Sequence, residues 1–188
     1  MKQPNWFERD FSRPVDPRLL PALLERLLGT PARLEEKLAG IAPEWLTTRV
    51  DGTWTIQENV GHLADLEPLW LGRLEDIVDG AAELRSTDLN NEATTRAGHN
   101  AVPLAALLQS FRQQRLRTVH RLQALSDDVL DRAALHPRLR TPMRPVDLFA
   151  FVAEHDDHHL ARISALARQL AGAQAADMIS PAATPLPA

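Results

Sequence analysis

Cysteine is absent from the 188 residues of this chain. Its absence excludes disulfides, a cysteine nucleophile and zinc or iron–sulfur sites ligated by cysteine, so any metal site must use histidines and carboxylates. Lysine and arginine form no cluster, and the formal net charge of −4 gives no basic surface for nucleic acid or an anionic membrane. We therefore expect a small-molecule substrate, with no nucleic-acid or membrane partner.

Long apolar runs are also missing. No stretch of about 18 apolar residues occurs, and the first ten residues contain acidic side chains and no apolar core. We expect neither a membrane span nor a signal peptide, and a cytoplasmic location. With 44% hydrophobic and 24% charged residues, the chain has enough apolar side chains for one globular domain with a sizeable core.

Glycine-rich phosphate loops, internal repeats and the alternating pattern of a buried strand are absent as well. Apolar residues instead recur at helical spacing, which predicts an all-α domain over residues 1–172, packed as a four-helix bundle. The predicted long helices cover residues 17–40, 55–80, 103–125 and 145–170, with a kink or break in the first at Gly29-Thr30-Pro31 and a short helix from Ser126 to about Leu135. The Ala/Pro-rich stretch 173–188 is expected to be a disordered tail.

A long connector, residues 81–102, separates the second and third long helices and has no periodicity. A loop of about twenty residues is uncommon inside a compact domain and is usually functional or mobile. We interpret it as a candidate lid over a site, with a solvated His99.

Two histidines interrupt the apolar face of the last helix. His155 and His159 are one turn apart in the segment A-E-H-D-D-H-H-L, where a buried face normally carries Leu, Ile or Val. Such a pair either finds hydrogen-bond partners in the core or binds a divalent metal ion, and the spacing alone favours neither. His62, at the margin of the apolar face of the second helix, is the candidate third ligand. Three neutral imidazoles would leave metal positions open for water or substrate, as in catalytic sites.

Two other metal chemistries fit the sequence poorly. The segment H-D-D-H-H resembles the zincin motif with Asp156 in the base position, but the one acidic or histidine residue after His159 is Asp177, in the tail. A di-iron bundle needs Glu-x-x-His on two helices, and this motif does not occur. Asp156 and Asp157 point away from the apolar face and are expected to be solvated.

The catalytic residue is not identified by the pattern, and four residues are candidates. Glu67 and Arg115 both project inward and are expected to pair, unless Arg115 extends its charge to solvent. His158 is either a group that supports the metal ligands or a surface residue.

His136 and His120 are expected at the surface, while Trp54 is a candidate for the edge of a pocket. The four catalytic candidates are Glu67, Glu58, His158 and Arg115.

The pairing of W-T-I-Q-E-N-V-G-H-L-A-D-L-E with A-E-H-D-D-H-H-L-A-R-I resembles the DinB-like superfamily of metalloenzymes, nearest its DinB/YfiT-like group of metal-dependent hydrolases. The likeness covers residues 15–172. It implies an up-down-down-up bundle, often a homodimer, with a nickel or zinc ion held by His62, His155 and His159. Relatives of this group include bacillithiol S-transferases and mycothiol-dependent isomerases.

The resemblance implies a metal-dependent enzyme that transfers a low-molecular-weight thiol of the bacillithiol type to an electrophile. The first alternative is a hydrolase that uses metal-bound hydroxide, with Glu67 or Glu58 as base. The second is a non-catalytic metal- or ligand-binding bundle of a stress response.

Overall fold

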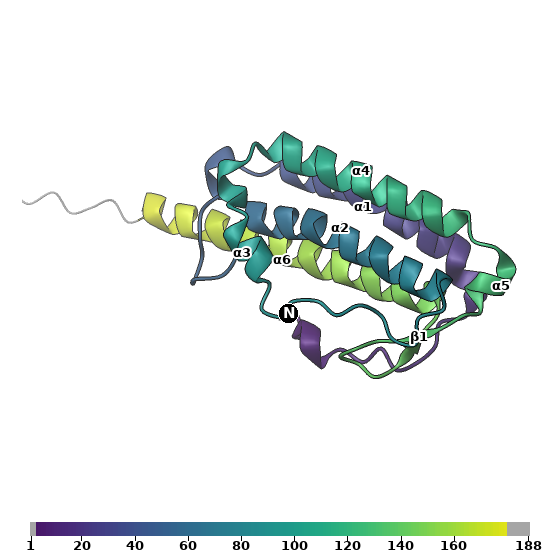
Figure 1. Cartoon of the computed structure of the whole chain (residues 1–188). Helices are drawn as coiled ribbons and strands as arrows, with labels where there is room; N and C mark the ends of the chain where they lie inside the picture. Colours follow the sequence, from purple (N-terminus) through teal and green to yellow (C-terminus); the bar gives the residue numbers. More distant parts are fainter. Residues whose placement is uncertain (1–2, 180–188) are drawn as a thin grey trace, which may run out of the picture.

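Four long helices form the body of the molecule, which a computed structural model describes over residues 3–179 (Figure 1). They lie close to the four predicted positions. Their bounds are Leu20–Ala39 for α1, Ile56–Val78 for α2, Leu104–Gln123 for α4 and Pro145–Ile179 for α6. The short elements are α3 (Glu92–Arg96), α5 (Asp127–Leu130), an antiparallel pair of two-residue strands, β1 (Ala134–Leu135) and β2 (Pro142–Met143), and four 3-10 turns, η1 (Trp6–Glu8), η2 (Pro17–Leu19), η3 (Pro43–Trp45) and η4 (His99–Ala101).

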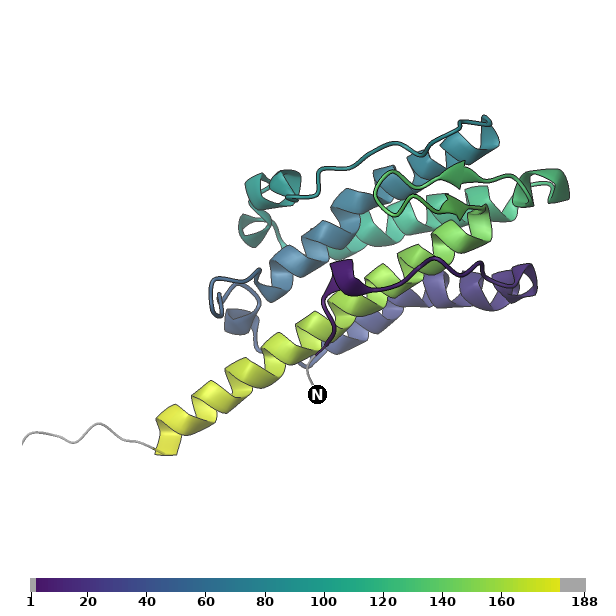
Figure 2. The same cartoon turned by 90° about the horizontal axis from the view of Figure 1, so that it is seen from below.

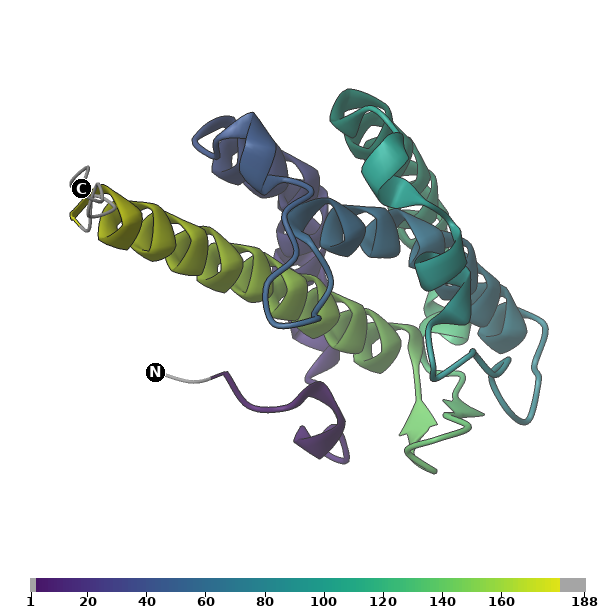
Figure 3. The same ribbon diagram turned by 90° about the vertical axis from the view of Figure 1, so that its left-hand side faces the viewer.

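The helices pack as a bundle in which α4 and α6 each contact both α1 and α2 (Figure 3). The consecutive helices α1 and α2 are therefore on opposite sides of the bundle. This arrangement confirms the predicted four-helix bundle. Within residues 3–179, no helix combines the length and the apolar character that a membrane crossing requires.

A capping box fixes the start of α2, as the sequence predicts. The side-chain oxygen of Thr55 accepts from the backbone N–H of Glu58 at 3.0 Å, and the Glu58 carboxylate accepts from the backbone N–H of Thr55 at 2.8 Å. These two bonds satisfy backbone donors that have no partner inside the helix. The cap fixes where α2 begins, and His62 follows Thr55 by seven residues, about two helical turns.

The sequence predicts a kink or a break at Gly29-Thr30-Pro31, and the break is wrong, because α1 is continuous through Pro31. A proline inside a helix leaves the carbonyl four residues earlier without its usual donor. Here that carbonyl belongs to Leu27, and it accepts a hydrogen bond from Nη1 of Arg115 on α4 at 3.4 Å. A tertiary contact thus replaces the missing helical bond.

The last helix is longer than predicted. α6 continues to Ile179, so the first seven residues of the stretch expected to be a disordered tail are helical. Three of the residues from Ala173 to Ala176 are alanine, the strongest helix former. The rest of that stretch, 180–188, lies outside the described residues. The helix after Ser126 ends at Leu130, earlier than expected, and the chain then forms the β1–β2 pair.

The apolar core has two parts, one at each end of the bundle. One includes Trp70, Phe151 and Val152, and the other includes Val60 and Ile163. On α6, His155 and His159 lie in sequence between residues of the two clusters, whereas His62 lies on α2 among residues of the second cluster. Seen from below (Figure 2), the N-terminal segment, the 81–98 connector and the β1–β2 pair cover the face formed by α2 and α6.

Candidate metal centre

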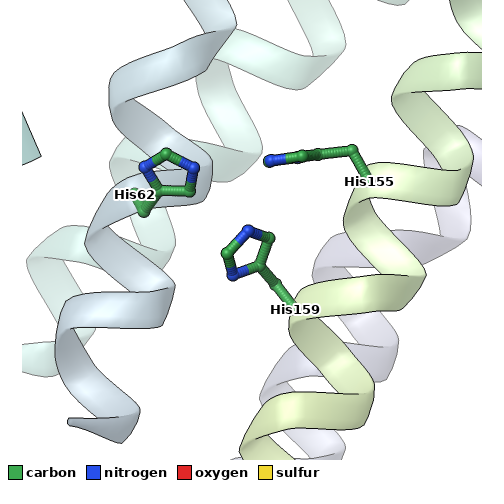
Figure 4. A group of neighbouring side chains, drawn as sticks. All are labelled: His62, His155 and His159. Carbon is green, nitrogen blue, oxygen red and sulfur yellow. The ribbon is translucent and has the colours of Figure 1, made fainter. Parts of the chain in front are cut away.

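Three imidazoles from two helices converge between α2 and α6 (Figure 4). His62 comes from α2, while His155 and His159 come from successive turns of α6. One nitrogen of each ring lies within 4.8 Å of the others. The three side chains are between 3% and 5% exposed. The i, i+4 spacing on α6 and the rotation of α2 therefore bring the predicted ligands together, close enough for one ion.

Hydrogen bonds fix the tautomers of two of these rings. Nδ1 of His62 lies 3.0 Å from the hydroxyl oxygen of Thr94, and that hydroxyl donates to Asp65 at 2.8 Å. The proton of the hydroxyl is used by Asp65, so Thr94 accepts from Nδ1–H of His62. The lone pair of His62 is consequently on Nε2, where a metal ion can use it.

Asn59 has the same effect on His159. The amide nitrogen of Asn59 donates to the backbone carbonyl of Thr55 at 2.8 Å, which orients the amide. Its oxygen then lies 2.9 Å from Nδ1 of His159 and accepts a proton from it. Nε2 of His159 therefore also carries a lone pair. Partners that orient the other nitrogen of a ligating imidazole are typical of metal sites.

The third ring, His155, has no such partner. Its Nδ1 is buried and makes no hydrogen bond to any residue in 3–179. Buried polar atoms without partners are rare, and each needs an explanation. The proximity of this ring to the Nε2 lone pairs of His62 and His159 is the observation that favours a cation.

The electrostatic environment keeps all three rings uncharged. Burial lowers the pKa of His62 to about 4, although the nearby Asp65 carboxylate partly opposes the shift. Burial and the neighbouring imidazoles lower the pKa of His155 and His159 well below the usual value. Neutral imidazoles are the form that binds metal ions, so the site is ready for a cation at neutral pH.

The 81–102 connector packs onto α2 beside this site. His99 was expected to be solvated, but it is 6% exposed and its Nε2 lies 2.8 Å from the Asp65 carboxylate. The backbone oxygen of His99 accepts from the Gln57 side chain at 2.6 Å. Gly61 leaves the space that the His99 ring occupies, since a Cβ there would lie 2.3 Å from that ring. The connector thus orients a candidate metal ligand, His62, through Thr94.

The inward charges of α2 and α4 form a buried network. Arg115 binds Glu67 at 2.6 Å, as predicted, and also binds Asp156 at 2.5 Å. The expectation that Asp156 is solvated is wrong, because its side chain is 0% exposed. Thr118 donates to the second oxygen of Glu67 at 3.1 Å. Glu67 and Arg115 therefore use most of their hydrogen-bonding capacity on each other and on these neighbours.

The other two catalytic candidates lie apart from that network. Glu58 caps α2 and pairs with Arg49 at 2.6 Å. His158 is buried, and its ring centroid lies 5.6 Å from that of Trp6 and 5.3 Å from that of His159. Neither Glu67 nor Glu58 lines the cavity that adjoins His62 and His155. Trp54, the expected pocket edge, packs its ring 4.7 Å from that of His62.

A cavity of about 270 Å³ adjoins His62 and His155. Its walls are largely apolar, with several polar side chains among them, which is usual for small-molecule sites. The lining includes the apolar residues Trp6, Leu66, Leu69, Trp70 and Phe151, and the polar residues Arg73, Asp88, His136 and Arg138. His136, expected at the surface, is 3% exposed and lines this cavity.

Fold and site together define a helical-bundle protein with a buried three-histidine candidate metal centre beside a cavity. Residues 26–163 match the family model of the DinB superfamily, which is more than two thirds of the chain. The chain therefore belongs to the DinB superfamily, and the resemblance noted from its two histidine motifs is confirmed.

The fold is similar to that of YfiT from Bacillus subtilis, with a TM-score of 0.74 and 20% sequence identity. The similarity covers 90% of this chain and 94% of that one. No protein of curated function matches the sequence.

Proposed function

We propose that this protein is a divalent-metal-dependent enzyme whose nickel or zinc ion is held by His62, His155 and His159. The observation that carries the proposal is the convergence of three buried, neutral imidazoles, two of them with Nδ1 occupied and Nε2 free. His62 and His155 also line the cavity, so a substrate there has access to the ion.

A divalent ion in such a site lowers the pKa of a thiol or a water molecule beside it and so supplies a nucleophile near neutral pH. We propose that the nucleophile is the thiol of a small cofactor of the bacillithiol type, which is transferred to an electrophile. The chain has no cysteine, so the thiol must come from outside.

The carboxylates of the chain support transfer over hydrolysis. Asp88 is the acidic residue that lines the cavity, and its two oxygens accept from the backbone N–H groups of Asn90 at 2.9 Å and Glu92 at 2.5 Å. Glu67 and Glu58, the bases expected for hydrolysis, are engaged elsewhere. A general base must reach the proton that it removes. A thiol depends less on such a base than water does, because its own pKa is lower.

Hydrolysis by an activated water is the second candidate function. It is favoured by the structural similarity to YfiT, which is described as a probable metal-dependent hydrolase. A homodimer and a cytoplasmic location, both expected from the sequence, stay predictions.

Metal content and turnover test the proposal. Elemental mass spectrometry of the purified protein should find about one equivalent of nickel or zinc, and a variant with His62, His155 and His159 changed to Ala should have none. His120→Ala, an exposed histidine on α4, is the matched control and should keep its metal. A wild-type protein that neither contains nickel or zinc nor binds them when they are added would refute the metal site.

Turnover assays on the metal-loaded protein identify which nucleophile is used. Turnover of an electrophilic dye that requires bacillithiol or another small thiol supports transfer. Cleavage of an ester or amide without any thiol supports hydrolysis instead. A metal-loaded protein without turnover in either assay supports the non-catalytic alternative.

A further inference from the structure

The cavity has a basic end that the proposed metal chemistry does not use. Arg73 follows His62 on α2 by eleven residues, which is three helical turns and about 20°. Both side chains therefore project to the same face of α2, about 16 Å apart along its axis. Leu66 and Leu69 lie between them, and all four residues line the cavity.

Arg73 is a buried cation without a counter-ion. Its side chain is 1% exposed, and within residues 3–179 it forms no ion pair with a carboxylate. Its Nε donates to the backbone oxygen of Arg85 at 3.1 Å. The nearby carboxylate of Asp76 is already bound to Arg85 at 2.7 Å. Burial lowers the pKa of Arg73 to about 10, so the guanidinium is still charged at neutral pH.

The guanidinium of Arg73 lies 5.5 Å from the centre of the Trp70 ring, but no carboxylate in the described part of the chain neutralises it. Burying a charge without a counter-ion is costly, which makes this arrangement unusual. The other fully buried arginine of the described chain, Arg115, shows the usual solution, because it binds two buried carboxylates. Among residues 3–179, no carboxylate binds Arg73 in the way that Glu67 and Asp156 bind Arg115.

The polar neighbours of the His136 ring are all hydrogen-bond donors, although one of its two nitrogens must itself donate. Nε2 of His136 lies 3.2 Å from Nη1 of Arg73, and Nδ1 lies 3.2 Å from the backbone nitrogens of both Arg138 and Leu139. All three neighbours are donors, while a neutral imidazole has one lone pair and one N–H. Whichever nitrogen carries the proton, two donors face each other. An acceptor that takes the hydrogen bonds of Arg73 would remove this conflict.

Arg138 adds a second unpaired cation to the same end of the cavity. Its guanidinium lies 5.1 Å from the centre of the Phe7 ring, and it forms no ion pair with a carboxylate within the described residues. The charged groups that line the cavity are therefore two guanidinium groups and the Asp88 carboxylate. The excess of one positive charge fits a monoanion better than a dianion.

We propose that Arg73, Arg138 and His136 form a subsite for the carboxylate of an organic acid. The apolar part of the acid lies against Trp6, Trp70 and Phe151, which line the cavity between the basic end and the histidines. A carboxylate supplies the acceptors that His136 and Arg73 lack, and it can bind a guanidinium through two parallel hydrogen bonds. We place the reacting part of the acid at its other end, beside the histidines, and this step rests on the proposed function. Binding of the carboxylate itself does not require a metal ion.

Calorimetric titration with 4-phenylbutyrate tests the subsite. The acid should bind, and the isosteric neutral amide 4-phenylbutyramide should bind at least tenfold more weakly, since hydrogen bonds between charged groups are stronger than those to a neutral acceptor. Equal binding of acid and amide, or no binding of the acid, would overturn the proposal. Tighter binding of phenyl phosphate than of the acid would overturn the choice of a carboxylate.

Variants separate the subsite from the metal centre. Arg73→Lys keeps the positive charge but removes the planar guanidinium that binds a carboxylate through two hydrogen bonds. Arg138→Gln changes a half-buried loop residue, so this variant still tests the subsite if Arg73→Lys does not fold. Both should weaken binding of the acid at least tenfold. Arg140→Gln is the matched control, because Arg140 is an exposed residue of the same loop that pairs with Glu83. It should bind the acid as the wild type does.

The titrations are repeated after the protein has been treated with EDTA and dialysed. Retained binding that still depends on Arg73 and Arg138 supports the subsite even if the protein has no catalytic metal. Binding that disappears with the metal ion would show that the acid coordinates the ion, and would overturn the subsite while leaving the metal centre intact.

Discussion

Nδ1 of His62 on α2 lies 3.0 Å from the hydroxyl oxygen of Thr94 on α3, 32 residues later in the chain. Thr94 donates in turn to Asp65, and the same carboxylate oxygen of Asp65 accepts from His99. The 81–102 connector thereby fixes the ring of a proposed metal ligand. Connector residues from Ser86 to Asn91 also line the cavity, so the connector both covers the site and orients that ligand.

Loss of the Thr94 hydroxyl should weaken metal binding. Thr94→Val keeps the shape of the side chain but removes the acceptor for Nδ1–H of His62, so the ring can rotate. Changes of this kind typically lower metal affinity about 10–100-fold. Competition with a chromophoric chelator for zinc measures the affinity.

Thr95→Val is the matched control for this change. Thr95 is exposed on the same short helix, and its hydroxyl bonds to the backbone oxygen of Asn91 at 3.2 Å. Its variant should bind zinc as the wild type does. Equal affinities in both variants and the wild type would contradict the role given to Thr94.

A methyl group at Gly61 should loosen the connector. The Cβ of an alanine there would lie 2.3 Å from the His99 ring, so the ring and its bond to Asp65 must move. Gly29, within α1, has no atom within 4 Å of the corresponding position. Alanine is favoured over glycine in a helix by about 1 kcal/mol.

We therefore expect the same substitution, glycine to alanine, to change the free energy of unfolding in opposite directions at the two positions. Gly29→Ala should raise the free energy of unfolding by up to about 1 kcal/mol, and Gly61→Ala should lower it. Urea unfolding followed by circular dichroism measures both. A stabilised Gly61→Ala variant would mean that His99 does not pack against α2 as described.

The elements and residues that were predictable from sequence depend on local patterns. The helices follow from apolar periodicity, the start of α2 from its capping box, and the meeting of His155 with His159 from their one-turn spacing. The pair of Glu67 with Arg115 was predictable because both charges project inward on their own helices.

The residues that sequence analysis missed depend on contacts between distant segments. Asp156 was placed outside the core because one buried face was assumed for its helix, but α6 packs against both α1 and α2 and buries more than one face. Thr94 and His136 lie in segments without periodicity. Their partners, His62 and Arg73, are 32 and 63 residues away. No local signal in the sequence indicates those contacts.

Removal of the Arg115 charge should strongly destabilise the protein. In Arg115→Met, the carboxylates of Glu67 and Asp156 lose the cation that compensates them inside the bundle. Breaking a buried ion pair in this way costs roughly 3–5 kcal/mol. The matched control is Arg112→Met, one turn earlier on α4, which removes a half-exposed pair with Glu35 and should cost at most about 1 kcal/mol. Similar losses in urea unfolding for the two variants would contradict this difference.

Acidification should destabilise the metal-free protein between about pH 7 and pH 4. Burial, with the charges of Arg73 and Arg138, lowers the pKa of His136 to about 4, and burial lowers that of His62 to about 4. In the unfolded chain a histidine has a pKa of about 6.5, so between these values the unfolded state binds protons that the folded state does not. Stability is therefore complete above about pH 7 and decreases as the pH falls.

His136→Gln isolates one of these histidines. The variant removes a group whose protonation favours unfolding, so its loss of stability from pH 7.5 to pH 5.0 should be smaller than that of the wild type. His120→Gln changes an exposed histidine and should reproduce the wild-type loss. Urea unfolding of EDTA-treated protein at the two pH values gives the comparison without a contribution from metal release. If His136→Gln loses as much stability as the wild type, His136 is not held neutral by its burial beside Arg73.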